Sequence, residues 1–365
     1  MNKYYSILDF LKYHVFPKLS PKSSKYRVAI LTAIYSGFDG VSRVVEQQAK
    51  ELSKMCDVTI FTLEADMEAP ENVRLRVLWS PRNLILNRLY RLFLFLNLIA
   101  FFKYVIELRT FDILITHHYP LSLIAYFTKK LFGIKYIQWH HHVPSDIYTK
   151  FYELLYIKLI EYFEERSFIV KGADIVCSIS EYSRDLLLRK GGIDSIVVYN
   201  RLNEERFRIN VDGKRIREKY KLGDSPILLF VGRIHPQKNV YGLIKVFKMI
   251  KEQRPDVKLI IVGKPIIDEY YKKVKSISDD SVIFAGYVSD DELPYYYAAC
   301  DVYVTCSLSE GFNLPLVEAQ KYGKPVIAFD IGPHREVVTN GILVEVGNIK
   351  RFVNSVIKLI DCKNG

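Results

Sequence analysis

The chain has 365 residues, of which 49% are hydrophobic and 25% charged, and its formal net charge is +11. This balance is typical of a globular protein, and the length allows two domains with substantial cores, so a disordered chain is excluded. The five cysteines are scattered without a C-x-x-C pair, which favours a reducing compartment over a disulfide framework. No cleavable signal peptide is visible, because Asp9 and Lys12 interrupt the first apolar segment. We therefore expect a cytoplasmic protein.

Two segments hold most of the net positive charge. Residues 1–27 contain six Lys or Arg against one acid, and residues 82–109 contain five against one. Both segments are rich in Leu, Ile, Phe and Tyr, the pattern of a surface that meets anionic lipid, so the protein is expected to be peripheral on the cytoplasmic face of a membrane. The longest uncharged run there, residues 92–102, is far shorter than the roughly 20 residues that span a bilayer. The alternative is that residues 84–108 form one helix packed on a sheet. No recognised nucleic-acid-binding motif is present, so nucleic acid is not expected as a partner.

The first half of the chain alternates between apolar runs and helical segments. Residues 26–33 form a continuous apolar run, typical of a strand buried in a parallel sheet. A loop that ends at Gly40 follows, and then a helix over 41–54. This order predicts a doubly wound α/β domain over residues 26–202, preceded by a basic arm, 1–25. Gly40 would let a phosphate or an acceptor approach the backbone closely. Further strands are expected near 57–61, 74–79, 112–116 and 136–139.

Three adjacent histidines, His140, His141 and His142, follow the strand expected at 136–139. Successive side chains of an extended chain point to opposite faces, so at most His140 and His142 share a face. No Cys, Asp or Glu stands nearby at a spacing that would complete a metal site. A metal centre is therefore not predicted here.

A second α/β series begins with the apolar run 226–231 and defines a second domain, 226–365. The polar segment 203–225 has no strong apolar period, so it is expected to be the linker. The loop after the run begins with Gly232 and Arg233 and reaches Lys238. A guanidinium fork and an ammonium group on one loop at the carboxyl end of a strand can bind a diphosphate from two sides.

A second loop of this domain leads into a helix that Pro315 is suited to start. Asn313 or Leu314 would lie at the cap, and the unpaired N–H groups there attract anions. Glu310 and Glu318 stand on either side of this helix start. Since acids beside a phosphate are unfavourable, we expect them to accept hydrogen bonds from sugar hydroxyls.

The two spacings, Gly-Arg-x4-Lys at 232–238 and Glu-x7-Glu at 310–318, resemble the motifs of glycosyltransferase family 4. Members of that family are retaining, sugar-nucleotide-dependent enzymes of the GT-B fold. The resemblance implies two Rossmann-like α/β domains that face each other across a cleft, with the nucleotide sugar held by the C-terminal domain. It implies that Arg233 and Lys238 stabilise the diphosphate, Glu310 contacts the hexose and Glu318 binds the ribose. The other donor-binding residues that it implies in this domain are Gly232, Gly311, Phe312, Asn313 and Leu314.

The resemblance is weaker in the first half. Asp39-Gly40 stands where the family commonly has Gly-Gly, and His142 matches a His-x-Pro histidine that contacts the donor sugar or the reaction centre. His141 takes that role if the strand end shifts by one residue. Family members commonly continue into a last helix that crosses back to the first domain, but this sequence stops after a helix expected at 349–360. Either the chain is trimmed or domain closure is supported differently.

The resemblance implies transfer of a hexose from GDP-mannose or a UDP-hexose to a lipid-linked or glycan acceptor. No cofactor is expected, and no metal, because the chain contains no Asp-x-Asp. The basic, apolar segments favour an acceptor carried by a membrane. Three alternatives remain: a sugar-nucleotide epimerase of the same fold, a non-catalytic nucleotide-sugar-binding scaffold, and a lipid-binding peripheral protein.

Overall fold

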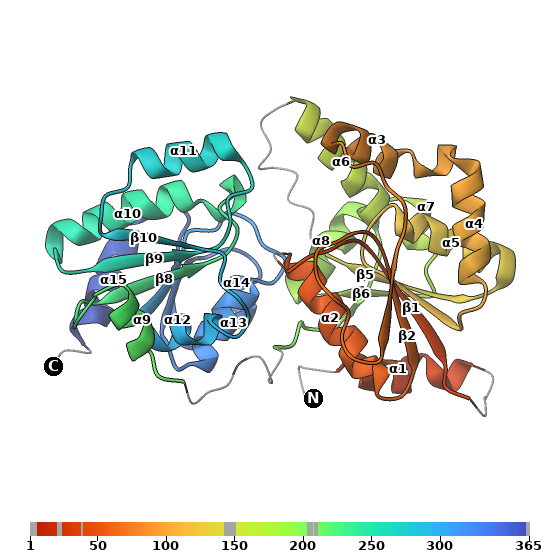
Figure 1. Ribbon diagram of the computed structural model, residues 1–365, viewed down its shortest axis with the longest axis horizontal. Helices are drawn as coiled ribbons and strands as arrows, with labels where there is room; N and C mark the ends of the chain where they lie inside the picture. Colours follow the sequence, from red (N-terminus) through yellow and green to blue (C-terminus); the bar gives the residue numbers. More distant parts are fainter. Residues whose placement is uncertain are drawn as a thin grey trace. The chain divides into compact units, whose positions relative to one another are not determined.

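The computed structural model describes residues 6–19, 24–37, 39–141, 151–202, 207 and 211–362. The chain forms two compact units, Met1–Arg201 and Leu202–Gly365. Each unit is a parallel sheet flanked by helices on both faces (Figure 1). The doubly wound α/β architecture expected from the alternating apolar runs is therefore confirmed.

The first unit holds a sheet of seven parallel strands in the order β3-β2-β1-β4-β5-β6-β7. The order reverses between β1 and β4, which are hydrogen-bonded neighbours. Their apolar runs are buried on both faces, as a sheet covered by helices on each side requires. The strands are β1 (Arg27–Tyr35), β2 (Asp57–Ala65), β3 (Val73–Val77), β4 (Ile113–Thr116), β5 (Lys135–His140), β6 (Ile175–Ser178) and β7 (Ile196–Val197).

Most helices of this unit connect consecutive parallel strands. Asp39 caps α2 by accepting a hydrogen bond from the backbone N–H of Ser42 at 3.0 Å. The Ser167 hydroxyl caps a short helix, Phe168–Lys171, by accepting a hydrogen bond from the backbone N–H of Ile169. The helices are α1 (Ile7–His14), α2 (Gly40–Ser53), α3 (Leu84–Leu92), α4 (Leu98–Leu108), α5 (Leu121–Phe132), α6 (Phe151–Glu165), α7 (Phe168–Lys171) and α8 (Glu181–Gly191), and a 3₁₀ turn, η1, spans Phe16–Lys18.

The segment expected as a basic arm is in part an integral element. Helix α1 buries Ile7, Phe10 and Leu11, which are no more than 4% exposed. Phe10 meets the ring of Trp139 of β5 edge-on at 6.0 Å between centroids. Helix α1 is therefore part of the first core, and its exposed residues are Lys12 and Tyr13.

Residues 84–108 form two helices instead of the single helix that the alternative interpretation supposed. A 3₁₀ turn, η2 (Leu94–Leu96), separates α3 from α4. The break occurs where Asn97 caps α4, its side-chain oxygen accepting from the N–H of Ala100 at 3.2 Å. A helix-capping Asn competes with helix continuation, so the chain turns there.

The second unit contains six parallel strands in the order β10-β9-β8-β11-β12-β13. Helices α10 and α11 cover one face and α12, α13 and α14 the other (Figure 1). The strands are β8 (Ile227–Val231), β9 (Lys258–Val262), β10 (Val282–Gly286), β11 (Val302–Thr305), β12 (Val326–Phe329) and β13 (Gly341–Val344). The helices are α9 (Lys214–Lys219), α10 (Val240–Gln253), α11 (Asp268–Ser276), α12 (Leu293–Ala299), α13 (Leu314–Lys321), α14 (His334–Val337) and α15 (Ile349–Asp361), with a 3₁₀ turn, η4 (Pro236–Lys238), before α10.

Part of the segment expected as a linker, 203–225, is folded. Helix α9 belongs to the second unit, and its Ile216 is fully buried. Arg217 donates to the carboxylate of Asp301 at 2.9 Å, which fixes α9 beside the start of β11. The sequence did not indicate this helix because a single apolar side chain anchors it.

Candidate active site

The two motif loops of the second unit lie side by side. One follows β8 and the other follows β11, and these strands are neighbours where the strand order reverses. Loops at the carboxyl ends of parallel strands diverge at such a reversal, which makes it the usual ligand site of an open α/β sheet. The sheet therefore places residues 232–238 beside residues 306–313.

Gln237 joins the two loops. Its carboxamide nitrogen donates to the carbonyl oxygen of Ser309 at 2.8 Å, and its own carbonyl oxygen accepts from the N–H of Leu308 at 3.0 Å. On the other side, Gly263 approaches Gly232 so closely that a Cβ on Gly263 would lie 2.0 Å from the Gly232 carbonyl oxygen. Only glycine fits at that contact, so the backbone of the β8 loop is held from two sides.

Lys238 and Glu310 form an ion pair across the two loops. The ammonium Nζ lies 2.5 Å from Glu310 Oε1, and the two side chains are 13% and 7% exposed. Burial by itself would raise the pKa of the Glu310 carboxyl, but the charge and hydrogen bond of Lys238 outweigh it and hold the pKa below its usual range. Glu310 is thus a carboxylate at neutral pH, with a cation held beside it.

Asn313 is fixed by a histidine outside the motif. It has a left-handed backbone, φ 73°, and its side chain donates to Nε2 of His334 at 2.8 Å instead of capping α13. The Nδ1–H of His334 donates to the carbonyl oxygen of Phe329 at 2.7 Å. Both bonds suit a neutral imidazole, and burial lowers the pKa of His334 accordingly. His334 is not among the residues that the motifs predicted for this site.

Glu318 lies in α13, inside the same site. It is 6% exposed, and the hydroxyl of Tyr297 donates to its Oε2 at 2.6 Å. A buried carboxylate needs such a donor, and the bond also fixes the direction of the acid. Tyr297 stacks on Tyr322 with 5.8 Å between ring centroids, so the donor itself is packed.

Arg233 completes the cationic side of the site. Among the described residues its guanidinium has no ion pair or side-chain hydrogen bond, although the side chain is half-buried. His235 lies between Arg233 and Lys238, and burial together with these two cations lowers its pKa to about 4. His235 is therefore neutral at pH 7, and the positive charge of the loop comes from Arg233 and Lys238.

The first unit contains the remaining predicted residues. Gly40 is the exposed first residue of α2, and no atom would contact a Cβ there within 4 Å. His142 lies outside the described residues. His141, which is described, is buried at the end of β5.

A buried hydrogen-bonded chain at the carboxyl edge of the first sheet was missed. His141 Nε2–H donates to Nδ1 of His117 at 2.9 Å, and His117 Nε2–H donates to the side-chain oxygen of Gln48 at 3.0 Å. Burial lowers the pKa of both imidazoles, so the chain is neutral. The signal that could have identified it is the pair His117-His118 directly after the strand expected at 112–116. Among the described residues no cluster of three or more His, Cys, Asp or Glu is arranged to hold a metal ion.

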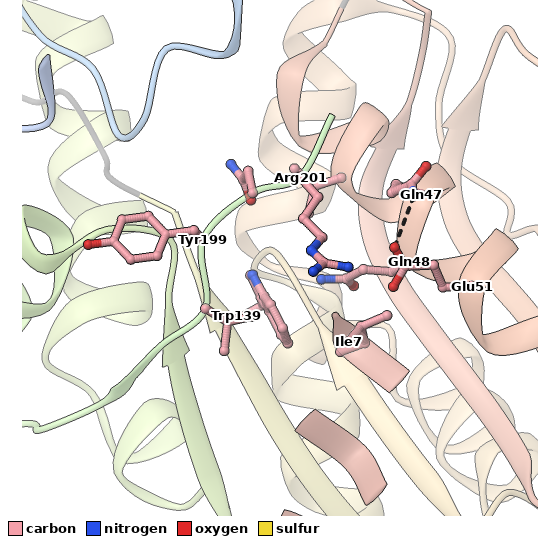
Figure 2. Close-up of a pocket in the computed structure, with 10 residues that line it drawn as sticks. Ile7, Gln47, Gln48, Glu51, Trp139, Tyr199 and Arg201 are labelled. Carbon is pink, nitrogen blue, oxygen red and sulfur yellow. Dashed lines mark hydrogen bonds between the residues drawn. The ribbon is translucent and has the colours of Figure 1, made fainter. Parts of the chain in front are cut away.

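A small cavity lies in the first unit between α1, α2 and the end of β5 (Figure 2). Its volume is about 30 Å³. The indole N–H of Trp139 and the side-chain oxygen of Asn200 line it without a hydrogen-bond partner among the described residues. A cavity of this size holds about one or two water molecules, which would satisfy these two atoms. It is too small for a sugar, so we assign no substrate to it.

Comparison with known proteins identifies the family. Residues 38–206 match the profile of "Glycosyltransferase Family 4", and residues 212–364 match that of "Glycosyl transferases group 1". The chain belongs to glycosyltransferase family 4. Both motif loops of this family-4 chain lie in the second match, so the expected family and its class, transferase, are confirmed.

Two curated relatives of this family-4 chain illustrate its range. It is 26% identical over 270 residues to the trehalose synthase of Pyrococcus horikoshii, a match to 70% of this chain and 61% of that protein. It is 28% identical over 204 residues to a GDP-mannose-dependent alpha-(1-6)-phosphatidylinositol monomannoside mannosyltransferase of Mycobacterium tuberculosis, a match to 52% of this chain and 53% of that protein. The matched region thus spans between about half and three fifths of these relatives.

A solved structure shares the fold of this family-4 chain over nearly its whole length. Anabaena HepE, crystallised in complex with UDP-glucose, aligns with a TM-score of 0.72 and 18% identity. The alignment covers 93% of this chain and 90% of that protein. At this identity the likeness concerns the fold alone, and it confirms the expected GT-B class.

Proposed function

We propose that this chain transfers a hexose, with retention of anomeric configuration, from a nucleoside-diphosphate sugar to a lipid-linked or glycan acceptor. The observation that carries the proposal is the group formed by Arg233, Lys238 and Glu310 where the strand order of the second sheet reverses. It places two cations suited to a diphosphate beside one carboxylate suited to sugar hydroxyls. Such a set fits a ligand that joins a diphosphate to a sugar.

Each residue has a role that follows from its chemistry. As the bond between sugar and diphosphate breaks, negative charge builds up on the departing diphosphate. Cations fixed in place beforehand stabilise that charge without reorganising, so Arg233 and Lys238 lower the barrier. The N–H groups of residues 311–314 at the start of α13 assist. Glu310, held as a carboxylate, accepts from a hexose hydroxyl, and Glu318 accepts from the ribose.

The first unit supplies the acceptor side in this proposal. Gly40 lets the acceptor approach the start of α2, and His142 contacts the donor sugar. Both assignments rest on the family resemblance. The buried chain from His141 through His117 to Gln48 would fix the backbone at the strand end that precedes His142.

The donor is GDP-mannose or a UDP-hexose. One relative is named for GDP-mannose, and HepE was crystallised with UDP-glucose. A thermal-shift titration with UDP, GDP, ADP and their sugars tests this. A ligand that binds only the folded protein raises the free energy of unfolding by about 2.7 kcal/mol when its concentration is a hundredfold above its Kd. If none of these nucleotides raises the melting temperature, the proposal is contradicted.

Turnover then separates the alternatives. A transferase releases nucleoside diphosphate only when an acceptor is present, apart from slow hydrolysis. Conversion of the donor sugar without an acceptor would instead favour an epimerase. Binding without turnover on any acceptor would favour a scaffold.

The proposed transfer uses no metal and no cofactor, since Arg233 and Lys238 supply the positive charge that a metal ion would otherwise provide. We expect the rate of transfer to be the same in EDTA as in Mg²⁺. A rate that falls more than about tenfold in EDTA and returns with Mg²⁺ would contradict this, because it would correspond to more than about 1.4 kcal/mol of barrier.

A further inference from the structure

Helices α3 and α4, with the turn η2 between them, lie at the margin of the first unit (Figure 1). They expose an unusual amount of apolar side chain. We call this the α3–α4 surface. Its large hydrophobic side chains are between 43% and 86% exposed. They are Ile85, Leu86, Leu89, Phe93, Leu96, Leu98, Ile99, Phe102 and Ile106.

The exposed positions follow the helix period. In α3 and just beyond it they begin at Ile85 with the spacing i, i+1, i+4, i+8, and in α4 the same spacing begins at Leu98. Residues at this spacing share one side of a helix. The opposite side of α4 is also apolar, since Phe101 and Val105 are buried in the core. A surface helix of a soluble protein normally turns its polar side outward, whereas this apolar outer side has no partner among the described residues.

The charges around this surface are positive. Arg82, Lys103 and Arg109 are exposed and form no ion pair among the described residues. Glu107, the single acid of segment 82–109, is neutralised by Arg76 at 3.1 Å. Exposed apolar side chains framed by unpaired cations match an anionic lipid headgroup layer over an acyl interior. We propose that the α3–α4 surface docks this protein on an anionic lipid bilayer.

The helices would lie in the bilayer plane. At 1.5 Å per residue, α3 and α4 are each about 14–17 Å long, about half of a hydrocarbon core. Among the described residues no helix is long and apolar enough to cross a membrane. Trp79, 65% exposed, meets Tyr90 edge-on at 5.4 Å, and this aromatic pair has the amphipathic character suited to the headgroup layer.

The structure separates the two segments that the sequence marked as lipid-binding. The apolar side chains of α1 are used in the core, and Val15, which follows it, is 3% exposed. Of the large hydrophobic residues in 6–19, only Tyr13 is strongly exposed, at 71%. The docking surface is therefore segment 82–109, and residues 6–19 contribute no apolar insertion.

The surface is also connected to the acceptor side of the site. The hydroxyl of Tyr119 donates to the carbonyl oxygen of Leu92 at the end of α3, at 2.6 Å. Tyr119 follows His117 and His118 in the same loop. If the proposed transfer holds, a lipid-linked acceptor in the same bilayer would be presented near this edge of the sheet; this extension alone rests on the proposed function.

The test is co-sedimentation of the full chain with vesicles, without nucleotide. We expect binding to vesicles of equal parts phosphatidylcholine and phosphatidylglycerol at low salt, and none to phosphatidylcholine alone. The double variant Leu96→Glu/Ile99→Glu should weaken binding at least about tenfold, because it removes two exposed side chains that bilayer contact would bury. Both positions are exposed, so the melting temperature should not change.

Two matched variants serve as controls. Tyr13→Glu adds one negative charge on α1, and Met249→Glu adds one at an exposed apolar position of α10, so the two together match the two charges of the test variant. Each of them, and the double variant Tyr13→Glu/Met249→Glu, should bind like the wild type. The proposal is overturned if the wild type ignores anionic vesicles or if the double variant binds them equally. It is also overturned if the double variant only converts a dimer into a monomer, which would make the surface a protein contact. Nucleotide binding is measured separately, so that a failure of the membrane-docking proposal can be distinguished from a failure of the proposed transfer.

Discussion

At the scale of single residues, we expect the ion pair between Lys238 and Glu310 to have the largest effect on the rate of transfer. Replacing Lys238 by Ala should lower kcat by about 10²–10³, the usual effect of losing one group that stabilises developing charge. It also leaves Glu310 buried beside no ammonium group, so the pKa of Glu310 should rise. Single-turnover rates at saturating donor measure the first effect. Lys238→Arg, which keeps the charge, should recover part of the rate, and a near-normal rate for Lys238→Ala would remove its assigned role.

Glu164 gives the chain a pH-dependent stability. Burial raises the pKa of its carboxyl from 4.5 to about 8, although it accepts a hydrogen bond from the N–H of Tyr119 at 3.0 Å. Between these two pH values the unfolded chain loses this proton while the folded chain keeps it. The free energy of unfolding should therefore fall as pH rises through this window, by up to about 1.4 kcal/mol per pH unit.

Urea unfolding near pH 5 and near pH 8 measures this contribution. Glu164→Gln keeps an oxygen that can accept from Tyr119 but does not titrate, so its stability should decline less between the two conditions. If the variant and the wild type lose the same free energy, Glu164 is not the titrating group.

At the scale of elements, the hydrogen bonds of Arg217 hold α9 in place together with the buried side chain of Ile216. Arg217 donates to the carbonyl oxygens of Gly223 and Ser225 at 3.0 and 2.9 Å, and to Asp301 at 2.9 Å. Asp301 also accepts from the N–H of Ile227, so the same carboxylate fixes the start of β8. Arg217→Ala removes the hydrogen bonds that Arg217 donates and should destabilise the second unit by about 2–3 kcal/mol.

Denaturant unfolding checks this, with Arg215→Ala as the matched variant. Arg215 lies in the same helix but is exposed, and its guanidinium only rests over the ring of Tyr295 at 5.1 Å. Its loss should cost about 1 kcal/mol or less. Equal costs for the two variants would mean that α9 is held by its packing and not by Arg217.

At the scale of the whole molecule, the described donor-binding candidates other than Gly40 lie in the second unit. We expect nucleoside diphosphate to slow amide hydrogen exchange mainly in residues 232–239 and 306–318. The reason is that bound ligand must leave before these loops open, which adds its binding free energy to their opening. Hydrogen-exchange mass spectrometry with and without UDP or GDP measures this, and protection confined to the first unit would contradict the assignment.

The sequence by itself determined the alternation of strands and helices and the two motif loops of the second unit. These are local properties, because a short run of apolar residues predicts a buried strand whichever neighbouring strand it pairs with in the sheet. The N-caps are local in the same sense, since Asn239 caps α10 and Ser180 caps α8 by accepting from a backbone N–H three residues further on. The family followed from motif spacing for the same reason.

Only the tertiary structure decided which side chains meet. The chain from His141 through His117 to Gln48 joins β5, the end of β4 and α2, and no spacing along the sequence records that meeting. The support of Asn313 by His334 is likewise a contact between separate elements, the N-cap of α13 and the first residue of α14. Burial distinguishes the two segments expected to bind lipid, because most apolar residues of α1 are buried in the core, whereas those of the α3–α4 surface are exposed. Composition counts apolar side chains, but only packing decides which of them remain in contact with water.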